Sequence, residues 1–472
     1  MATLATDWLF RPLTETAAAL VKRELSPVEL MQATLDRIEA VNEKLVAFVA
    51  LRDADQLLDE AREAERRIAR GEARALEGIP LGVKDLEDAA GMITTKGSVP
   101  FKDHLAQRDS IQVERLRAAG AIVVGKTNAP EFGYTAISKN LIFGASRNPW
   151  DLARTPGGSS GGSSAAIAAG LVTLATASDG GGSVRLPAAM TGCFGLKTSY
   201  GRIPHGPDEH WVTLDTSGHG PLTRTVADAA LHLDAVVGAH PLDPNSLPHP
   251  GISYREVLER LPAGLRIGFS QDLGYAVVQS DVADVVSDAV GAFEELGHRV
   301  ELLKGGPPEL GRDWGIGNSF EMLGVLAPLF AEHEHEFGRT FLQGLKAGAL
   351  MNPDRFANLR RRREELSRWC AEVFESFDLL VTPTLPYDPP PANGPFPTQI
   401  EGRKLPWASV ASFTIPFNLS WHPAATVRAG FSKAKLPVGM QIVAPRHRDD
   451  LVLQAAHAFE QARPWADHWP RL

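Results

Sequence analysis

The sequence predicts an α/β fold in which helices cover both faces of a β-sheet. Short apolar segments typical of buried strands alternate with helical segments between residues 110 and 177. The alternation starts again at Leu265, where a strand, a helix ended by Gly297 and a second strand form a βαβ unit. Continuous apolar strands of this kind are buried on both faces, so we expect the sheet to lie between layers of helices.

The N-terminal part of the chain predicts helices with recognisable ends. Ser26, Pro27 and Glu29 form a capping box with proline at the first helical position, which begins a helix that reaches about residue 40. A second helix, 54–70, is rich in Ala, Glu and Arg and stops at Gly71.

The first buried strand is expected at 79–85, with Lys84 near its end. Burial beside apolar residues lowers the pKa of a lysine because its charged form loses water. The elements expected after it are helix 110–119, strand 121–124, helix 163–169, strand 171–177, strand 265–270, helix 282–296, strand 299–303, a mainly helical region 309–376, strand 377–383, strands 424–427 and 438–443, and helix 449–461. A proline-rich loop at 383–397 is long enough to bind a ligand.

Composition and charge restrict the function classes. A chain of 472 residues suggests two or three domains by length alone. The net charge of −9 argues against a nucleic-acid partner, and the four arginines at 360–363 are followed by glutamates, which predicts a solvated helix face. The N-terminal segment MATLATDWLFRPL lacks a basic region, and no apolar stretch reaches transmembrane length, so we expect a cytoplasmic protein without a membrane partner.

Neither metal nor cofactor is expected. Cys193 and Cys370 lie far apart in the sequence and can build neither a disulfide framework nor a zinc cluster. His333 and His335 form a possible metal tract, but residues i and i+2 of a helix point apart. Residues 120–127 fit the letters of a phosphate-binding loop, yet their centre is typical of a buried strand.

The segment 155–200 organises the rest of the chain through two glycine–serine runs. These are GGSSGG at 157–162 and GGGS at 180–183. Glycine at this density costs backbone entropy, so it is kept where close approach or unusual dihedral angles are needed. Successive N–H groups can hold a developing oxyanion, and a serine among them can be a nucleophile if a base is within reach. A flexible linker is disfavoured, because the runs alternate with tightly apolar segments.

These runs and their surroundings resemble the amidase signature family. The matching segments are 157–163, 179–185 and 195–197, with further matches at 82–85, 95–98, 125–128 and 437–441. The resemblance covers roughly residues 10 to 460 and implies a single large domain with a mixed β-sheet and helices on both faces. Within residues 1–472 it implies N-terminal helices at about 10–75, a signature core at about 76–230, and a remainder at 260–465 that completes the sheet and the substrate loops.

The resemblance implies a Ser–cisSer–Lys triad. Ser183 matches the acyl-accepting nucleophile, Lys84 matches the base, and Ser159 matches the bridging serine, whose peptide bond to Gly158 is cis in the family. The chemistry is sound, because a serine hydroxyl is a poor nucleophile until its proton can leave. A buried lysine can accept that proton if desolvation lowers its pKa toward the working pH.

The residues around the nucleophile have expected supporting roles. The oxyanion hole is expected from the N–H groups of Gly180, Gly181, Gly182 and Ser183. Asp179 and Arg185 are expected to hold the shape of this loop, and the alternative is a surface ion pair of no consequence. Ser160 is expected to hydrogen-bond near the site, whereas Ser163 and Ser164 are expected to cap a helix start. Two departures from the family pattern are visible, Gly180 in place of a frequent threonine and Thr198 in place of a common proline.

The function implied by the resemblance is hydrolysis of a carboxylic amide, with esters as a side activity, through an acyl-enzyme on Ser183. The expected partner is a small-molecule amide, and a homodimer is a candidate assembly. Two alternatives stay open: the glutaminase subunit of a tRNA-dependent amidotransferase, and an inactive binding or scaffold protein of the same fold. Specificity is expected in loops at 314–329 and 387–412, whose aromatic residues favour an apolar or aryl group but are equally ordinary core residues.

Overall fold

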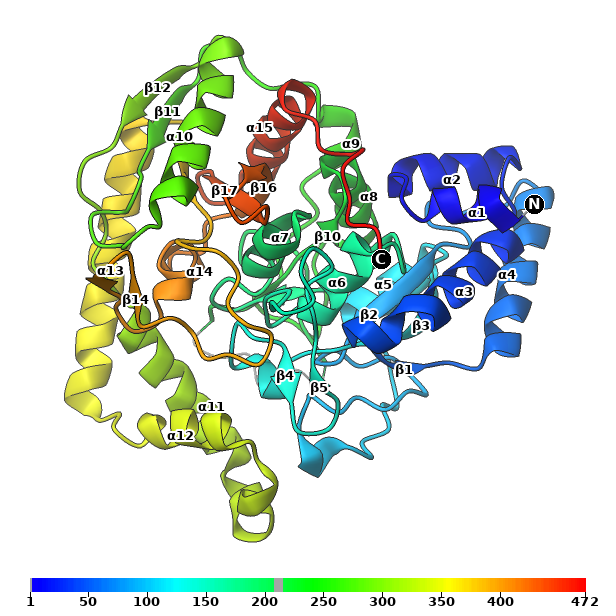
Figure 1. Ribbon diagram of the computed structural model, residues 1–472, viewed down its shortest axis with the longest axis horizontal. Helices are drawn as coiled ribbons and strands as arrows, with labels where there is room; N and C mark the ends of the chain where they lie inside the picture. Colours follow the sequence, from blue (N-terminus) through cyan, green and yellow to red (C-terminus); the bar gives the residue numbers. More distant parts are fainter. Residues whose placement is uncertain (1, 208–214) are drawn as a thin grey trace.

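The computed structural model describes residues 2–207 and 215–472, and a sheet of 11 strands forms its centre (Figure 1). The strand order is β1-β3-β2-β6-β10-β8-β16-β17-β13-β11-β12. The strands are β1 Phe48–Leu51, β2 Pro80–Lys84, β3 Ile122–Thr127, β6 Leu174–Ala175, β8 Phe194–Lys197, β10 Leu222–Thr223, β11 Arg266–Phe269, β12 Arg299–Leu302, β13 Leu379–Pro383, β16 Ala424–Phe431 and β17 Pro437–Val443. Since β2 is parallel to β3 while β16 is antiparallel to β17, the prediction of a mixed sheet is confirmed.

In the described parts of the chain, three two-stranded ribbons lie outside the central sheet, and helices account for much of the rest. The ribbons are β4 Lys139–Asn140 with β5 Gly144–Ala145, β7 Ser178–Asp179 with β9 Gly218–His219, and β14 Gln399–Ile400 with β15 Arg403–Lys404. The helices are α1 Ala2–Trp8, α2 Leu13–Lys22, α3 Pro27–Leu45, α4 Ala54–Ala69, α5 Ile111–Ala118, α6 Gly161–Ala168, α7 Arg185–Thr191, α8 Val226–Val236, α9 Tyr254–Val257, α10 Ser280–Glu295, α11 Gly311–His333, α12 Arg339–Gly348, α13 Pro353–Ser376, α14 Ile415–Leu419 and α15 Asp449–Ala462.

Helices pack against both faces of the sheet. In β17, Val438, Met440 and Ile442 belong to the apolar cluster that includes residues of α10 and α15. Gly439 lies between them and faces the other way, since a Cβ built there would be 2.5 Å from the Cβ of Ala189 in α7. The alternation of side chains along a strand therefore separates two apolar layers. Because one sheet contains strands from β1 to β17, the chain forms a single domain and not the two or three that its length suggests.

Several sequence-based expectations need correction. Residues 314–329, expected as a substrate loop, lie inside helix α11. The four arginines at 360–363 do not form one solvated face, because Arg362 pairs with Asp313 and Arg363 donates to the Leu419 carbonyl at 2.7 Å. The strand expected at 171–177 is reduced to the two residues of β6, Leu174–Ala175.

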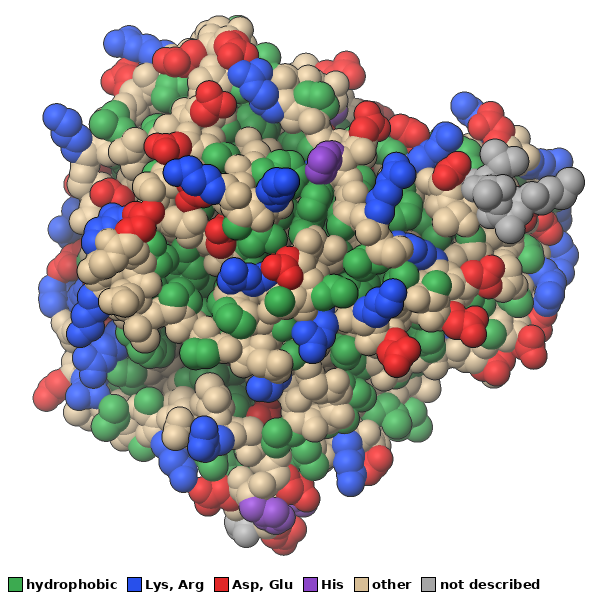
Figure 2. Space-filling view, in the orientation of Figure 1, with side chains coloured by type: hydrophobic (Ala, Val, Ile, Leu, Met, Phe, Trp, Pro, Cys, Tyr) green, Lys and Arg blue, Asp and Glu red, His purple; other side chains and the backbone are tan. Residues whose placement is uncertain are grey.

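The surface mixes charges of both signs. Figure 2 shows acidic and basic side chains interspersed over the face that it displays. None of the helices in the two described ranges has the length and apolar composition that a membrane crossing requires.

Candidate active site

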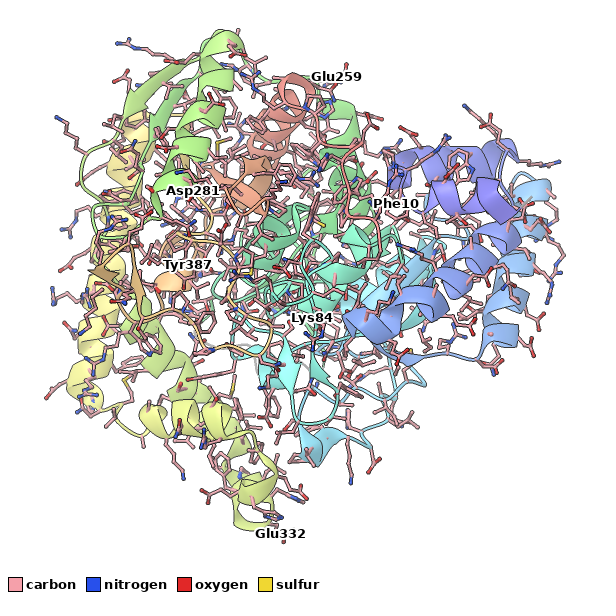
Figure 3. The ribbon with its side chains drawn as sticks, in the orientation of Figure 1. Phe10, Lys84, Glu259, Asp281, Glu332 and Tyr387 are labelled. Atoms are coloured by element: carbon pink, nitrogen blue, oxygen red, sulfur yellow. The ribbon has the colours of Figure 1, made fainter. Side chains whose placement is uncertain are left out.

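Lys84 is the last residue of β2, and its buried side chain reaches two serines. The Nζ atom lies 2.8 Å from Ser159 Oγ and 2.9 Å from Ser178 Oγ. The backbone N–H of Lys84 donates to Thr176 Oγ1 at 2.9 Å, which fixes the end of the strand. Figure 3 labels Lys84 near the centre of the molecule. Sequence reasoning missed Ser178, whose only sequence signal is its position beside Asp179.

Burial makes Lys84 a weaker base than a free lysine. Desolvation lowers its pKa from the ordinary value of 10.5 to about 7, although the charges of Glu87 and Asp179 act in the opposite direction. The neighbouring Asp85 is engaged elsewhere, because its carboxylate accepts a hydrogen bond from the Thr95 N–H at 3.1 Å and lies 4.0 Å from Lys126 Nζ. Lys84 therefore reaches a pKa at which a neutral amine is accessible near neutral pH.

The two glycine–serine runs lie against each other. The peptide bond between Gly158 and Ser159 is cis. The N–H of Ser160 donates to the carbonyl of Ser183 at 3.3 Å, and Ser160 Oγ lies 3.4 Å from the Ser178 carbonyl. Ser159 and Ser183 both line one cavity. The structure thus brings Lys84, Ser159 and Ser183 to one place, with Ser160 beside them.

Ser163 and Ser164 do not cap a helix start, which corrects the expectation for them. Both lie inside α6, where Ser163 Oγ donates to the Thr176 carbonyl at 2.9 Å and Ser164 Oγ donates to the Pro156 carbonyl at 3.1 Å. The helix begins at Gly161, earlier than expected, so both serines lie within it. Their hydroxyl groups connect the helix to neighbouring segments by hydrogen bonds.

The carboxylate of Asp179 holds the loop that precedes Ser183. It accepts hydrogen bonds from the N–H groups of Gly182, Val184 and Arg185 at 2.7, 3.2 and 3.3 Å. It also pairs with the Arg185 guanidinium at 2.9 Å, and both side chains are 0 % exposed, so the surface-pair alternative is wrong. Burial alone would raise the pKa of Asp179, but Arg185 holds it well below its ordinary value.

Arg185 connects this loop to the C-terminal third of the chain. Its guanidinium donates to the Thr414 carbonyl at 3.1 Å, to Asn418 Oδ1 at 2.6 Å and to Gln441 Oε1 at 2.7 Å. Asn418 Nδ2 in turn donates to the Asp179 carbonyl at 2.8 Å. Sequence reasoning missed Thr414 and Asn418, and only Gln441 lies within a segment that matched the family.

One of the four N–H groups expected to form the oxyanion hole is engaged elsewhere. The Gly182 N–H is donated to Asp179 Oδ1, so the expected hole is reduced to the N–H groups of Gly180, Gly181 and Ser183. Gly182 instead shapes the turn, with a φ of 132° and no room for a side chain, since a Cβ would be 2.5 Å from Thr414 Oγ1.

A cavity of about 1000 Å³ opens in front of Ser159 and Ser183. Both segments expected to determine specificity contribute to its wall. The apolar and aromatic residues of the wall include Leu86, Phe132, Tyr134, Leu186, Trp314, Ile316, Met322, Tyr387, Phe396, Leu405, Trp407 and Val410. Of the aromatic residues expected at the site, Phe320 is 46 % exposed and is absent from this wall.

The two cysteines and the histidine tract play no part in this cavity. Cys193 and Cys370 are buried and unpaired with each other. His333 Nδ1 lies 2.9 Å from Glu336. Across residues 2–207 and 215–472, no three His, Cys, Asp or Glu side chains are grouped so that they could hold a metal ion.

The fold is a large mixed sheet between helices, and its cavity is lined by Ser159 and Ser183, with the buried Lys84 in contact with Ser159. The chain belongs to the amidase family, because the family model Amidase matches residues 29–453. It is an amidase, a hydrolase acting on amide bonds.

Known proteins of the family resemble the chain over almost its whole length. It is 38 % identical to the acylamidase of Rhodococcus erythropolis over 97 % of this chain and 96 % of that protein. It is 34 % identical to one subunit of the glutamyl-tRNA(Gln) amidotransferase of Geobacter sp. strain M21 over 94 % and 96 % of the two chains. Among solved structures, a bacterial aryl acylamidase of the amidase signature family superposes with a TM-score of 0.90 at 30 % identity, covering 97 % of each chain.

Proposed function

We propose that this amidase works through an acyl-enzyme on Ser183, with Ser159 as a proton relay and Lys84 as the base. The observation that carries the proposal is the 2.8 Å contact between Lys84 Nζ and Ser159 Oγ, made by a lysine whose pKa burial lowers to about 7. A neutral Lys84 can accept a proton at a pH near 7 and above.

The proposed reaction has two acyl transfers. Ser183 Oγ attacks the amide carbon and forms a C–O bond, while its proton passes through Ser159 to Lys84. The C–N bond then breaks, and the proton returns through Ser159 to the departing amine. Water next attacks the ester carbon and gives one proton through Ser159 to Lys84. The C–O bond to Ser183 then breaks, the proton returns along the same path to Ser183 Oγ, and the carboxylic acid is released. The N–H groups of Gly180, Gly181 and Ser183 stabilise the oxyanion in both steps, and one such donor contributes about 10²–10³ in rate.

The substrate class that the cavity supports is an amide with an apolar or aryl group. Trp314, Phe396 and Trp407 line the wall, and rings of this kind bind apolar groups by contact area. The similarity to an acylamidase and to an aryl acylamidase supports the same class.

A second candidate is the glutaminase subunit of a tRNA-dependent amidotransferase. Its support is the 34 % identity to one subunit of a glutamyl-tRNA(Gln) amidotransferase. The two candidates differ in what the purified chain does alone. An amidase turns over aryl amides without partner proteins, whereas activity that needs partner proteins and is confined to glutamine would favour the second candidate.

The nucleophile is tested by labelling and substitution. A fluorophosphonate probe should label the wild type at Ser183, and Ser183→Ala should lose both the label and amide turnover while keeping the wild-type melting temperature. Ser163→Ala is the matched control, because Ser163 is buried in α6 and donates to a backbone carbonyl, so this variant should still be labelled. Labelling at Ser160 in the wild type would overturn the assignment.

The working context proposed is a cytoplasmic enzyme that uses neither metal nor cofactor and binds no nucleic acid, with a homodimer as the candidate assembly. The net charge of −9 supports the absence of nucleic acid, and the two unpaired cysteines are compatible with a reducing compartment. Light scattering on the purified chain tests the dimer.

A further inference from the structure

The three glycines before Ser183 differ in why they are glycine. A Cβ at Gly181 would lie 2.5 Å from Cζ2 of Trp314, and Gly182 has a positive φ and no space. Gly180 has neither constraint: its φ is not positive, and the nearest atom to a Cβ there is Ser217 Cβ at 3.6 Å among the described residues. The methyl group of an alanine would therefore fit at Gly180 when the cavity is empty.

The loop does not need the flexibility of a glycine at this position either. The indole Nε1 of Trp314 donates to the Gly180 carbonyl at 3.1 Å, and Asn418 Nδ2 donates to the preceding Asp179 carbonyl at 2.8 Å. The backbone on both sides of Gly180 is thus held by hydrogen bonds. Gly180 and Ser217 both line the cavity. A side chain at Gly180 would therefore reduce the space in front of Ser217.

The space between Gly180 and Ser217 lies on the acyl side of the substrate's amide bond. This step rests on the proposed function, in which the Gly180 N–H faces the scissile carbonyl oxygen and Ser159 protonates the amine. The amine then leaves on the Ser159 side, where a Cβ at Gly133 would lie 3.1 Å from Ser159 Oγ and 2.8 Å from Leu86 Cδ1. The acyl group occupies the other side of the carbonyl. The three atoms nearest a Cβ at Gly180 all belong to Ser217 and none to Ser159 or Leu86, so Gly180 is given to this acyl side.

We propose that Gly180 and Ser217 form the wall of an acyl subsite, and that the missing side chain at Gly180 admits acyl groups that are branched or aromatic at the carbon next to the scissile carbonyl. Gly180 is in this sense a specificity-determining residue, whereas Leu86 contacts the amine half.

The test is a ratio of specificity constants. The kcat/KM values of benzoyl and isobutyryl 4-nitroanilide are divided by that of acetyl 4-nitroanilide in the wild type, Gly180→Ala and Ser217→Val. All three substrates use the same oxyanion donors and leaving group, so any general loss of catalysis cancels in the ratio. Each variant should lower the ratio by roughly 10-fold or more, the discrimination expected when a pocket loses room for about one methyl group.

Two further variants make the test specific. Gly180→Ala combined with Ser217→Gly reopens the space from the other side and should restore most of the ratio. Leu86→Phe is the matched control on the amine side, and it should change the preference among acetylated amines of different size while keeping the acyl ratio within about twofold.

The outcomes separate this inference from the proposed function. If the wild type hydrolyses the anilides and is labelled at Ser183, but Gly180→Ala and Ser217→Val keep the wild-type ratio, the acyl subsite is wrong and the mechanism stands. An acyl ratio that falls as far in Leu86→Phe also overturns the assignment. If no anilide is hydrolysed, or the label lies on another residue, the proposed function fails first.

Discussion

Replacing Lys84 by methionine should remove most of the activity and stabilise the protein at neutral pH. A buried lysine whose pKa falls from 10.5 to about 7 destabilises the folded state by about 5 kcal/mol at pH 7 and below, at 1.36 kcal/mol per pH unit. Methionine has a similar length and needs no water, so this cost disappears. The variant also loses the hydrogen bonds to Ser159 and Ser178, each worth about 1 kcal/mol. A net gain of about 2–3 kcal/mol is expected at pH 7.

The sign of the pH dependence follows from proton binding. Between pH 7 and 10.5 the unfolded chain carries a proton on Lys84 and the folded chain does not, so wild-type stability rises with pH through this window. The advantage of Lys84→Met should therefore shrink by about 1.4 kcal/mol for each pH unit. Urea unfolding of both proteins at pH 7, 8 and 9 measures it. An advantage that stays constant with pH would refute the desolvated lysine.

The rate of the reaction should report the same group. The neutral lysine is the base, so kcat/KM should rise with pH along a limb with an apparent pKa of about 7, and the limb should vanish from the residual activity of Lys84→Met. Lys197 is the matched control: burial also lowers its pKa to about 7, but its Nζ donates to the Thr198 carbonyl at 2.7 Å. Lys197→Met should show the pH-dependent stability effect and keep the rate limb. A limb unchanged in Lys84→Met would remove Lys84 from the mechanism.

Asp179→Asn leaves the buried Arg185 without its charge partner, so thermal or urea unfolding should show a loss of about 3–5 kcal/mol, and a loss below 1 kcal/mol would contradict the role given to the pair. Gly181→Ala places a Cβ 2.5 Å from Trp314 and shifts the loop, so kcat/KM should fall about 10²-fold, with part of the loss recovered when Trp314→Leu is added. Prolonged EDTA treatment should leave amide turnover unchanged, and a loss that zinc alone restores would direct attention to His333 and His335.

Local sequence signals predicted the ends of elements well only where a capping residue or a glycine marks them. The capping box at Ser26 placed the start of α3, and Ser26 N–H indeed donates to Glu29 Oε2 at 3.1 Å. The helix continues to Leu45, beyond the expected end near residue 40. Val46 ends it in a left-handed conformation with φ 49°, and because this residue is not a glycine, the sequence contains no signal for the end. Residues 314–329 are expected as a substrate loop through the family resemblance, whereas the sequence itself predicts a mainly helical region at 309–376, and the structure has helix α11 there.

The residues of the candidate site also fall into two groups, those that the sequence identified and those that it did not. Lys84, Ser159 and Ser183 lie in segments whose composition alone indicates special chemistry, so the sequence pointed to them. Asn418 and Thr414 are ordinary polar residues more than 200 positions from the loop they hold, and nothing in their neighbourhood marks them. Their role comes from the pairing of β8 with β16, which is a long-range contact that local patterns do not encode.

The hydrogen bond between Arg185 and Gln441 also determines when the site can assemble during translation. The two residues are 256 positions apart, and synthesis proceeds at about 5–20 residues per second, so the guanidinium waits roughly 13–50 s for this acceptor to be translated. Until then the loop before Ser183 lacks its support from α14 and β17. A ribosome-bound chain therefore carries its serine in an unassembled pocket, and the growing polypeptide gains hydrolytic power only when nearly all of it has been translated.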